Sequence, residues 1–236
     1  MQVSQIYLSD STEGLPPYLL RCTDTVKASY PQFPYVLYGK ETLRQFLLER
    51  FDSEVVEAYD KLVPYSFKAD LGKYCLLYEL GGWYFDVSIR VVHSIVIPDT
   101  AASLAFRDIQ VNSGTSWAVS CGVIYSKAGN PVFQTAIKKV IQNCRNGHYG
   151  ITPLCPTGPT VLGQAFALND SDPNSFFGDL VTLTPSHAKK NAAFVVADGT
   201  IVAFLKPSPG GDLEQLGAKG TNNYNELYAA RRVYHV

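Results

Sequence analysis

The chain has 236 residues, of which 46% are hydrophobic and 17% charged, and its formal net charge is −1. This length and composition indicate one globular domain of some size or two small ones, and they exclude a disordered chain. The near-zero charge gives no electrostatic basis for binding nucleic acid, and the absence of an uninterrupted run of about 18 apolar residues predicts no transmembrane helix.

The first third of the chain alternates between short strands and amphipathic helices. The expected strands are 3–8 and 35–38. The expected helices are 16–29, 41–51 and 54–62, each with apolar residues at helical spacing. Strand–helix alternation of this kind predicts a parallel sheet covered by helices.

The stretch 67–90 has three parts, which predict a helix, a turn and a strand in that order. Residues 67–80 have the apolar spacing of a helix. Gly81-Gly82 predicts its end, because glycine adopts the left-handed conformation at little cost. The aromatic and β-branched run 84–92 then predicts a central buried strand. Asp86 lies inside this apolar run, where a carboxylate needs a partner. Capping a neighbouring helix or pairing with an arginine would meet that need, so a purely structural role for Asp86 stays open.

The rest of the chain predicts more strands, two helices and a glycine-containing tail. The expected strands are 103–106, 118–126, 181–184, 193–197 and 200–205, the last two joined by a turn at Asp198-Gly199. The expected helices are 130–143 and 160–168, and residues 169–178 are expected to form a polar loop. We expect one domain over 1–209, followed by a flexible segment over 210–236.

The order of residues in 69–88 resembles sugar-nucleotide glycosyltransferases with a DxD motif. This group includes mannosyltransferases of the Och type, capsular polysaccharide synthesis transferases and the glucosylating domain of large bacterial toxins. Its pattern, A-D-L-x-R-Y-x-x-L-Y followed by G-G-x-Y-x-D-x-D, is matched here by ADLGKYCLLY and GGWYFDVS. Lys73 replaces the usual arginine, and Ser88 replaces the second aspartate. Ser88 offers only a neutral oxygen, so metal affinity should be lower than with two carboxylates.

The resemblance implies an α/β fold: a GT-A-like, Rossmann-type mixed sheet with helices on both faces, in a single domain. It also implies roles for individual residues. Asp70 and Asp86 would be catalytic, and 210–236 would close over the donor. The implied donor-binding residues are Tyr7, Asp70, Lys73, Tyr84, Asp86, Ser88, Gly158 and Arg231, with Arg232 or Lys219 as other cations for the diphosphate. The implied ligands of a divalent metal, Mn²⁺ by expectation, are Asp86, Ser88, Asn222 and Asn223.

The implied activity is transfer of a hexose from a UDP- or GDP-type sugar to a glycan or lipid-linked acceptor, with retention, in surface polysaccharide synthesis. The five cysteines are odd in number and form no CxxC, so they indicate neither a zinc site nor a disulfide framework. They and the lack of a secretory signal at the N-terminus favour the cytoplasm, with the inner face of the membrane and peripheral contact with it left open.

Two other classes of protein stay open at this point. Ser88 in place of an aspartate is also what a non-catalytic nucleotide-sugar or glycan-binding protein with a degenerate site would show. A nucleotidyltransferase would need a glycine-rich phosphate loop after the first strand, and SDSTEG is a poor candidate for one. For Asp70 and Lys73, the alternative to a functional role is a surface ion pair worth under about 1 kcal/mol.

Overall fold

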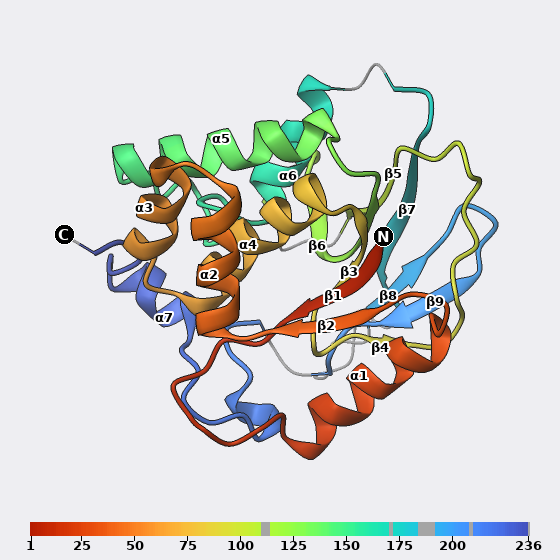
Figure 1. Cartoon of the computed structure of the whole chain (residues 1–236), viewed down its shortest axis with the longest axis horizontal. Helices are drawn as coiled ribbons and strands as arrows, with labels where there is room; N and C mark the ends of the chain where they lie inside the picture. The colour runs from red at the N-terminus through yellow and green to blue at the C-terminus, as the bar shows by residue number, and fades with distance from the viewer. Residues whose placement is uncertain (110–113, 170–171, 184–191, 208–209, 236) are drawn as a thin grey trace.

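We describe the chain from a computed structural model, which describes residues 1–109, 114–169, 172–183, 192–207 and 210–235 (Figure 1). The strands are β1 (Gln2–Ile6), β2 (Tyr35–Tyr38), β3 (Gly82–Phe85), β4 (Arg90–Val91), β5 (Ser103–Asp108), β6 (Val119–Ser126), β7 (Ser175–Thr182), β8 (Ala192–Val195) and β9 (Ile201–Phe204). The helices are α1 (Pro17–Ser29), α2 (Lys40–Arg50), α3 (Ser53–Lys61), α4 (Tyr65–Glu79), α5 (Pro131–Asn146), α6 (Pro159–Leu168), the 3-10 helix η2 (Glu214–Leu216) and α7 (Tyr224–Ala229).

The strands form one mixed sheet in the order β2-β1-β3-β6-β5-β7-β8-β9-β4. β1 runs parallel to β2 and β3, and β5 runs parallel to β7. The other neighbouring pairs are antiparallel. The parallel pairing predicted from strand–helix alternation in the first third of the chain is therefore confirmed. The mixed sheet implied by the resemblance is confirmed for the described residues.

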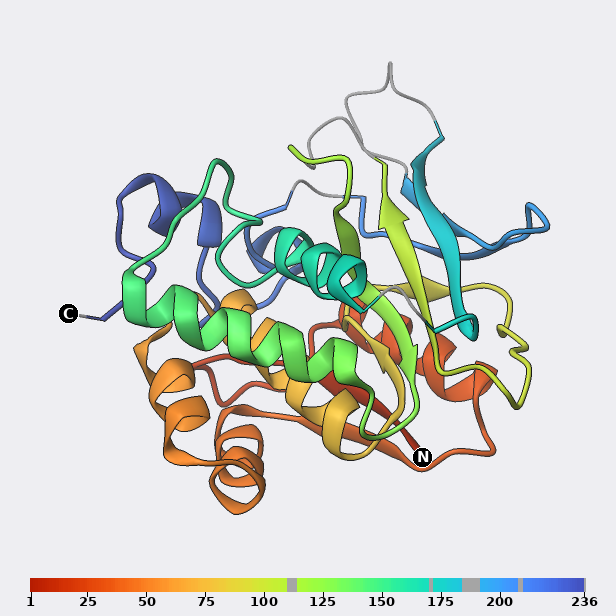
Figure 2. The same cartoon turned by 90° about the horizontal axis from the view of Figure 1, so that it is seen from above.

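Helices cover both faces of the sheet, and the alternation along β3 shows why. Tyr84 belongs to the core under α2 to α6, whereas Trp83 and Phe85 belong to the core on the other face, which includes Val26 of α1. Figures 1 and 2 show α5 and α6 on one side of the sheet and α1 on the opposite side. A strand buried on both faces reads as a continuous apolar run, which is how β3 appears in the sequence.

The predicted single strand 84–92 is wrong, because the chain turns between β3 and β4. The Ile89 N–H donates to the Asp86 carbonyl over 3.0 Å, and the Asp86 N–H donates to the Gly122 carbonyl over 2.8 Å. Val87 and Ile89 stay buried in this turn, so its apolar sequence resembles that of a strand. The consequence is that Asp86 directly follows a short strand instead of lying within a long one.

Two predictions about the second half of the sheet also need correction. The polar loop expected over 169–178 contains the start of β7, which pairs in parallel with β5 from Ser175 onward. Gly178 and Asp179 interrupt the apolar residues of β7, and most of its side chains are half-exposed, so the segment lacks the pattern of a buried strand. The β8–β9 hairpin is confirmed, but its loop spans residues 196–200. Thr184 of the expected strand 181–184, residues 208–209 of the expected domain 1–209 and Val236 of the expected C-terminal segment lie outside the described residues.

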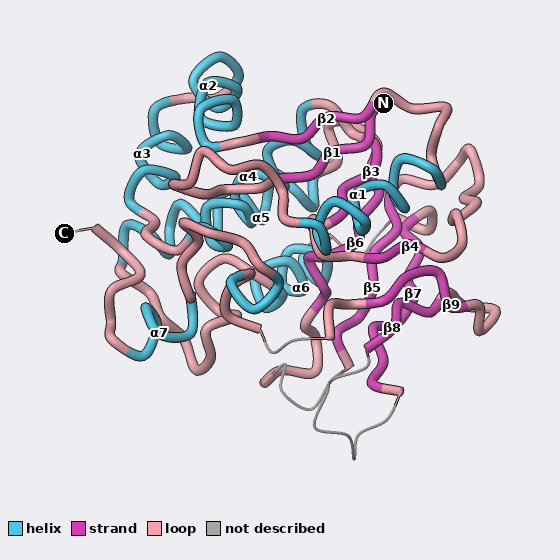
Figure 3. The backbone as a smooth tube through the Cα atoms, turned by 90° about the horizontal axis from the view of Figure 1, so that it is seen from below, coloured by secondary structure: helices cyan, strands magenta, loops and turns pink. Residues whose placement is uncertain are grey.

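The C-terminal segment folds back against the first third of the chain (Figure 3). The Asp10 N–H donates to the Gly220 carbonyl over 2.8 Å, and the Val63 N–H donates to the Val233 carbonyl over 2.9 Å. The Tyr224 ring of α7 lies 5.8 Å from the Phe67 ring of α4. These contacts put the segment 210–235 beside the ends of β1 and α4.

All five cysteines are buried and unpaired. Cys75, Cys121 and Cys144 lie in the core under α2 to α6, where they pack as small core residues. None of the helices in the described parts of the chain combines the length and the apolar character needed to cross a membrane.

Candidate active site

A cavity of about 500 Å³ lies at the ends of β1 and β3 and beneath the C-terminal segment. β1 and β3 are parallel, so their carboxyl ends meet at the same edge of the sheet, where open α/β folds bind ligands. The predicted site residues that line this cavity are Tyr7, Asp70, Lys73, Tyr84, Asp86, Ser88, Gly158 and Asn222. Asn223 and Arg231 are not among its lining residues.

Asp86 is held so that one side of its carboxylate is fixed and the other is open. Its Oδ1 accepts hydrogen bonds from the Tyr84 hydroxyl over 2.9 Å and from the Lys73 ammonium over 3.1 Å. No described residue donates to its Oδ2, and the side chain is 39% exposed. Gln5 Nε2 also donates to the Asp86 carbonyl over 3.3 Å. Asp86 therefore presents one free carboxylate oxygen from a fixed backbone position at the end of β3.

Lys73 occupies the centre of a buried charged cluster. Its Nζ lies 3.1 Å from each of three acceptors: Asp70 Oδ1, Asp86 Oδ1 and the Cys121 carbonyl oxygen. An ammonium has three N–H donors, so this set uses all of them. Burial lowers the pKa of Lys73, but the nearby carboxylates of Asp86 and Asp70 raise it well above its usual range. Lys73 is therefore charged, and a contact with a donor would require one of these bonds to break.

Asp70 joins this cluster to the start of α6. Its Oδ2 accepts a hydrogen bond from the Thr157 hydroxyl over 2.8 Å. A Cβ added to Gly158 would lie only 3.2 Å from the same oxygen, so glycine permits this close approach. The Tyr74 hydroxyl donates to the Thr157 carbonyl over 2.8 Å and fixes the same turn. Burial raises the pKa of Asp70, and the Lys73 charge opposes that shift.

The C-terminal residues predicted to bind metal or diphosphate make other contacts in this conformation. Asn222 Oδ1 accepts from the Tyr65 N–H over 2.9 Å, and Asn223 Oδ1 accepts from the Asn225 N–H over 3.0 Å at the start of α7. The Arg231 guanidinium lies over the Tyr149 ring, 4.4 Å from its centroid. These three side chains thus have structural partners within the protein.

The side chains at the cavity fit a divalent metal in part. Asp86 offers one free oxygen, and Ser88 lines the cavity beside it. In the parts of the chain that the structure describes, no group of three or more His, Cys, Asp or Glu could hold a metal ion. Ions such as Mg²⁺ are commonly held by one or two carboxylates together with substrate phosphates. This arrangement suits an ion that is bound jointly by the protein and a diphosphate.

Sequence reasoning missed two residues of the site. Gln5 lies on β1, and its side chain bridges the Tyr35 hydroxyl, 2.7 Å from Oε1, to the Asp86 carbonyl. Lys206 follows β9 and lines the cavity. Neither residue lies in a recognisable motif, because the contacts that bring it to the site join strands far apart in the chain.

The mixed sheet with helices on both faces is a GT-A-like fold. The solved structure titled "PaToxG Glycosyltransferase" superimposes with a TM-score of 0.55 and 16% identity, over 71% of this chain and 69% of that one. A glycosyltransferase described as involved in the glycosylation of the major capsid of PBCV-1 covers 78% of this chain and 84% of its own, with 9% identity. Its TM-score of 0.42 is too low to carry an argument.

The family comparison is more specific. Residues 16–106 match the family model described as "Glycosyltransferase sugar-binding region containing DXD motif". The "Inositol phosphoceramide mannosyltransferase 3" of Schizosaccharomyces pombe is 25% identical over 135 residues, which is 56% of this chain and 36% of that protein. The chain thus spans little more than a third of that curated relative. The predicted resemblance is confirmed: residues 16–106, from α1 into β5, match the sugar-binding region of the DXD glycosyltransferases.

Proposed function

We propose that the chain transfers a hexose from a nucleotide-diphosphate sugar to a glycan or glycolipid acceptor. The observation that carries this proposal is Asp86, which ends β3 with one carboxylate oxygen fixed and the other open to a cavity of about 500 Å³. This carboxylate lies within the matched region 16–106. A cavity of this size, with a few converging polar groups, is typical of a small-molecule site.

In the proposed reaction, the bond between the sugar C1 and the diphosphate oxygen breaks, and a new bond forms from C1 to an acceptor hydroxyl oxygen. The acceptor proton passes to a diphosphate oxygen, so the nucleoside diphosphate leaves with that proton. Asp70 and Asp86 hold the donor, and Tyr7 stacks against the base. The start of α6, at Gly158, lines the cavity, and the positive end of a helix favours an anion. Departure of the diphosphate from the same face as attack gives retention.

A divalent ion, with Mn²⁺ as our expectation, would be held by Asp86 Oδ2, Ser88 and the diphosphate of the donor. Its contribution would be to neutralise the charge that grows on the leaving group. Asn222 and Asn223 would become ligands only by releasing the N–H groups of Tyr65 and Asn225. The carboxylate of Asp86 is thus the central ligand in this proposal.

The choice of sugar and acceptor rests on the curated relative. The printed name of the curated relative specifies mannose and inositol phosphoceramide. We therefore favour a GDP-type donor of mannose and a lipid-linked acceptor, with UDP-type donors as the alternative. A role in surface polysaccharide synthesis, a cytoplasmic location and closure of the segment 210–236 over the donor stay predictions from the sequence.

The proposal is tested by titration calorimetry of UDP, GDP and CDP and by donor hydrolysis, on the wild-type chain and on Asp86→Ala. We expect one diphosphate to bind, and we expect Asp86→Ala to lose binding and hydrolysis. Asp60→Asn, which alters an exposed ion pair with Arg44 away from the cavity, is the matched control and should retain both. Circular dichroism of each variant checks the fold.

The same measurements separate the proposal from the non-catalytic alternative that Ser88 suggests. A folded chain that binds a nucleotide sugar but never hydrolyses or transfers it would be a binding protein. A folded chain that binds none of the nucleotides or nucleotide sugars would contradict both functions.

A further inference from the structure

We infer that Lys206 supplies the positive charge that neutralises the leaving diphosphate, so that nucleotide binding depends only weakly on a divalent ion. This inference deepens the proposed function and rests on it. It assigns to Lys206 a contact with the diphosphate oxygens of the nucleotide. The scarcity of cations in the cavity lining, the free donors of Lys206 and the loss of the second motif aspartate support it.

The cavity contains few cations that a diphosphate could reach. Among the described residues that line it, Lys73 and Lys206 are the only lysines, and none is an arginine. Lys73 is 2% exposed, and its three donors are already engaged by Asp70, Asp86 and the Cys121 carbonyl. Lys206 is therefore the one cationic side chain of this lining with N–H donors to spare.

The surroundings of Lys206 suit an anionic ligand. Its Nζ donates to the Asp212 carbonyl over 2.6 Å, and no second acceptor is present in the described part of the chain. Burial lowers the pKa of Lys206, while Asp212 and Asp86 oppose that shift through their charges. Lys206 thus lies within electrostatic reach of Asp86, half-buried and with donors that have no protein partner. A diphosphate would satisfy these donors and favour the charged ammonium.

The other cations that the sequence suggested for this role lie elsewhere. Arg231 stacks over Tyr149, and neither it nor Arg232 lines the cavity. Lys219 forms an exposed ion pair with Glu13, 2.8 Å apart. Each would have to leave its present position to reach the diphosphate.

Lys206 also compensates for the change at Ser88. Replacing the second motif aspartate with serine removes one negative charge, which weakens the attraction for a divalent ion. An ammonium within electrostatic reach of Asp86 then balances part of the diphosphate charge without an ion. At the two motif positions, where the family pattern provides two carboxylates for a metal, the chain therefore has one carboxylate, Asp86, and Lys206 adds one available ammonium to the same cavity.

The test is titration calorimetry of the preferred nucleoside diphosphate and of the corresponding nucleoside, each with chelator and with Mn²⁺. The variants are Lys206→Gln, which removes the charge, and Lys206→Arg, which keeps it. Lys127→Gln is the matched control, because Lys127 also donates to a single backbone carbonyl, that of Thr100, outside the cavity.

In chelator, we expect Lys206→Gln to weaken diphosphate binding about 10- to 100-fold, the usual range for a lost charge-assisted hydrogen bond. Nucleoside binding should not change, and Lys206→Arg should recover most of the loss. Lys127→Gln should behave as wild type. For the wild-type chain, chelator should weaken diphosphate binding less than the loss of Lys206 does.

Three outcomes would overturn the inference. Equal diphosphate affinity for wild type and Lys206→Gln would exclude the contact. Equal loss of nucleoside and diphosphate binding would assign Lys206 only the structural role of holding the Asp212 carbonyl. Binding by wild type only with Mn²⁺ would exclude the weak metal dependence while leaving the proposed function intact. Failure of wild type to bind any nucleotide would instead contradict the proposed function itself.

Discussion

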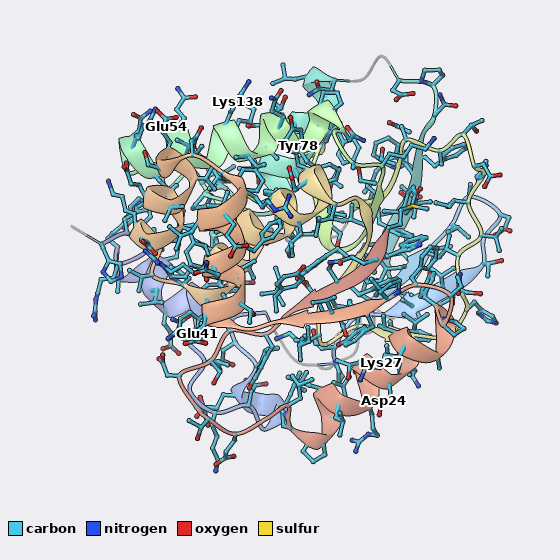
Figure 4. The ribbon with its side chains drawn as sticks, viewed as in Figure 1. Asp24, Lys27, Glu41, Glu54, Tyr78 and Lys138 are labelled. Carbon is cyan, nitrogen blue, oxygen red and sulfur yellow. The ribbon has the colours of Figure 1, made fainter. Side chains whose placement is uncertain are left out.

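Two helices of this chain carry an aspartate and a lysine three residues apart, in opposite surroundings. On α1, Asp24 and Lys27 lie at the surface, with Nζ and Oδ1 3.7 Å apart and side chains 59% and 45% exposed (Figure 4). On α4, Asp70 and Lys73 lie in the core beside the cavity, 3.1 Å apart and 12% and 3% exposed. The spacing brings the two side chains of each pair onto one helix face.

The difference between the pairs is in what surrounds them. Lys27 lies in water, and besides Asp24 its ammonium contacts the Tyr35 ring 4.7 Å away. Lys73 has two further acceptors, Asp86 Oδ1 and the Cys121 carbonyl, and Asp70 has a further donor in Thr157. A buried charge without such partners would be very costly. The same sequence pattern therefore gives a weak surface pair on α1 and a complete internal network on α4.

The largest difference between the pairs should appear when the lysines are removed. Lys73→Met leaves Asp70 and Asp86 facing each other without a cation, and we expect it to lower the free energy of unfolding by about 3–5 kcal/mol. Lys27→Met should lower it by less than about 1 kcal/mol. Urea denaturation of both variants measures the contrast. Similar losses would show that the α4 network is no more important for stability than a surface pair.

A smaller difference should follow from neutralising the aspartates. Asp70→Asn keeps the size of the side chain and an oxygen for Lys73, but it removes the charge and places an amide against Thr157. We expect a loss of about 1–2 kcal/mol, close to that of a lost hydrogen bond to a charged group. Asp24→Asn should change stability by less than about 0.5 kcal/mol.

Calorimetry on the same two aspartate variants sharpens the comparison. Donor binding should weaken in Asp70→Asn and stay unchanged in Asp24→Asn, because only Asp70 lines the cavity. Unchanged donor affinity in a stable Asp70→Asn would limit Asp70 to a structural role.

The hydroxyls of α4 allow the same comparison within one helix. The Tyr74 hydroxyl is buried and donates to the Thr157 carbonyl, whereas the Tyr78 hydroxyl only accepts from exposed Gln134 over 3.4 Å (Figure 4). Tyr74→Phe should cost about 1–2 kcal/mol, because it leaves a buried carbonyl unsatisfied. Tyr78→Phe should change stability by less than about 0.5 kcal/mol. Thermal unfolding of the two variants would contradict this assignment if their midpoints fell equally.

The features of this site that the sequence predicted are local ones. The i,i+3 spacing of Asp70 and Lys73, the Gly81-Gly82 turn and the buried strand before Asp86 all lie within 20 residues of one another, and each has a physical signature. The helices were predicted well for the same reason, since their apolar spacing and caps are local. The start of β7 was missed because Gly178 and Asp179 interrupt its apolar residues, so it lacks the signature of a buried strand.

The contacts that were not predicted join distant segments. Thr157 donates to Asp70 across 87 positions of the chain, and Cys121 provides the third acceptor of Lys73 across 48 positions. Lys206 reaches the cavity only because β9 pairs with β8 at the far side of the sheet. Sheet order determines these contacts, and a single sequence contains little information about sheet order.

Apart from the control variants, the smallest loss of stability that we predict concerns the N-terminus of α4. Asn222 there accepts a hydrogen bond from the Tyr65 N–H and donates to the Val63 carbonyl over 3.2 Å. The N-cap residue of α4, Pro64, makes no side-chain capping bond of its own. Asn222→Ala should therefore cost about 1 kcal/mol. Asn222→Asp keeps the acceptor and adds a charge that the helix dipole favours, so stability should rise by a few tenths of a kcal/mol.

Manganese titration of the same variants, with nucleotide present, decides between the two roles of Asn222. If Asn222 is a metal ligand, a carboxylate at this position should tighten Mn²⁺ binding markedly, because the ion would then have a second carboxylate ligand besides Asp86. If Asn222 serves α4, as its bonds in the structure indicate, Mn²⁺ affinity should be the same in wild type and in Asn222→Asp. In that case Lys206 supplies the positive charge for the diphosphate, and a metal bound by the C-terminal segment does not.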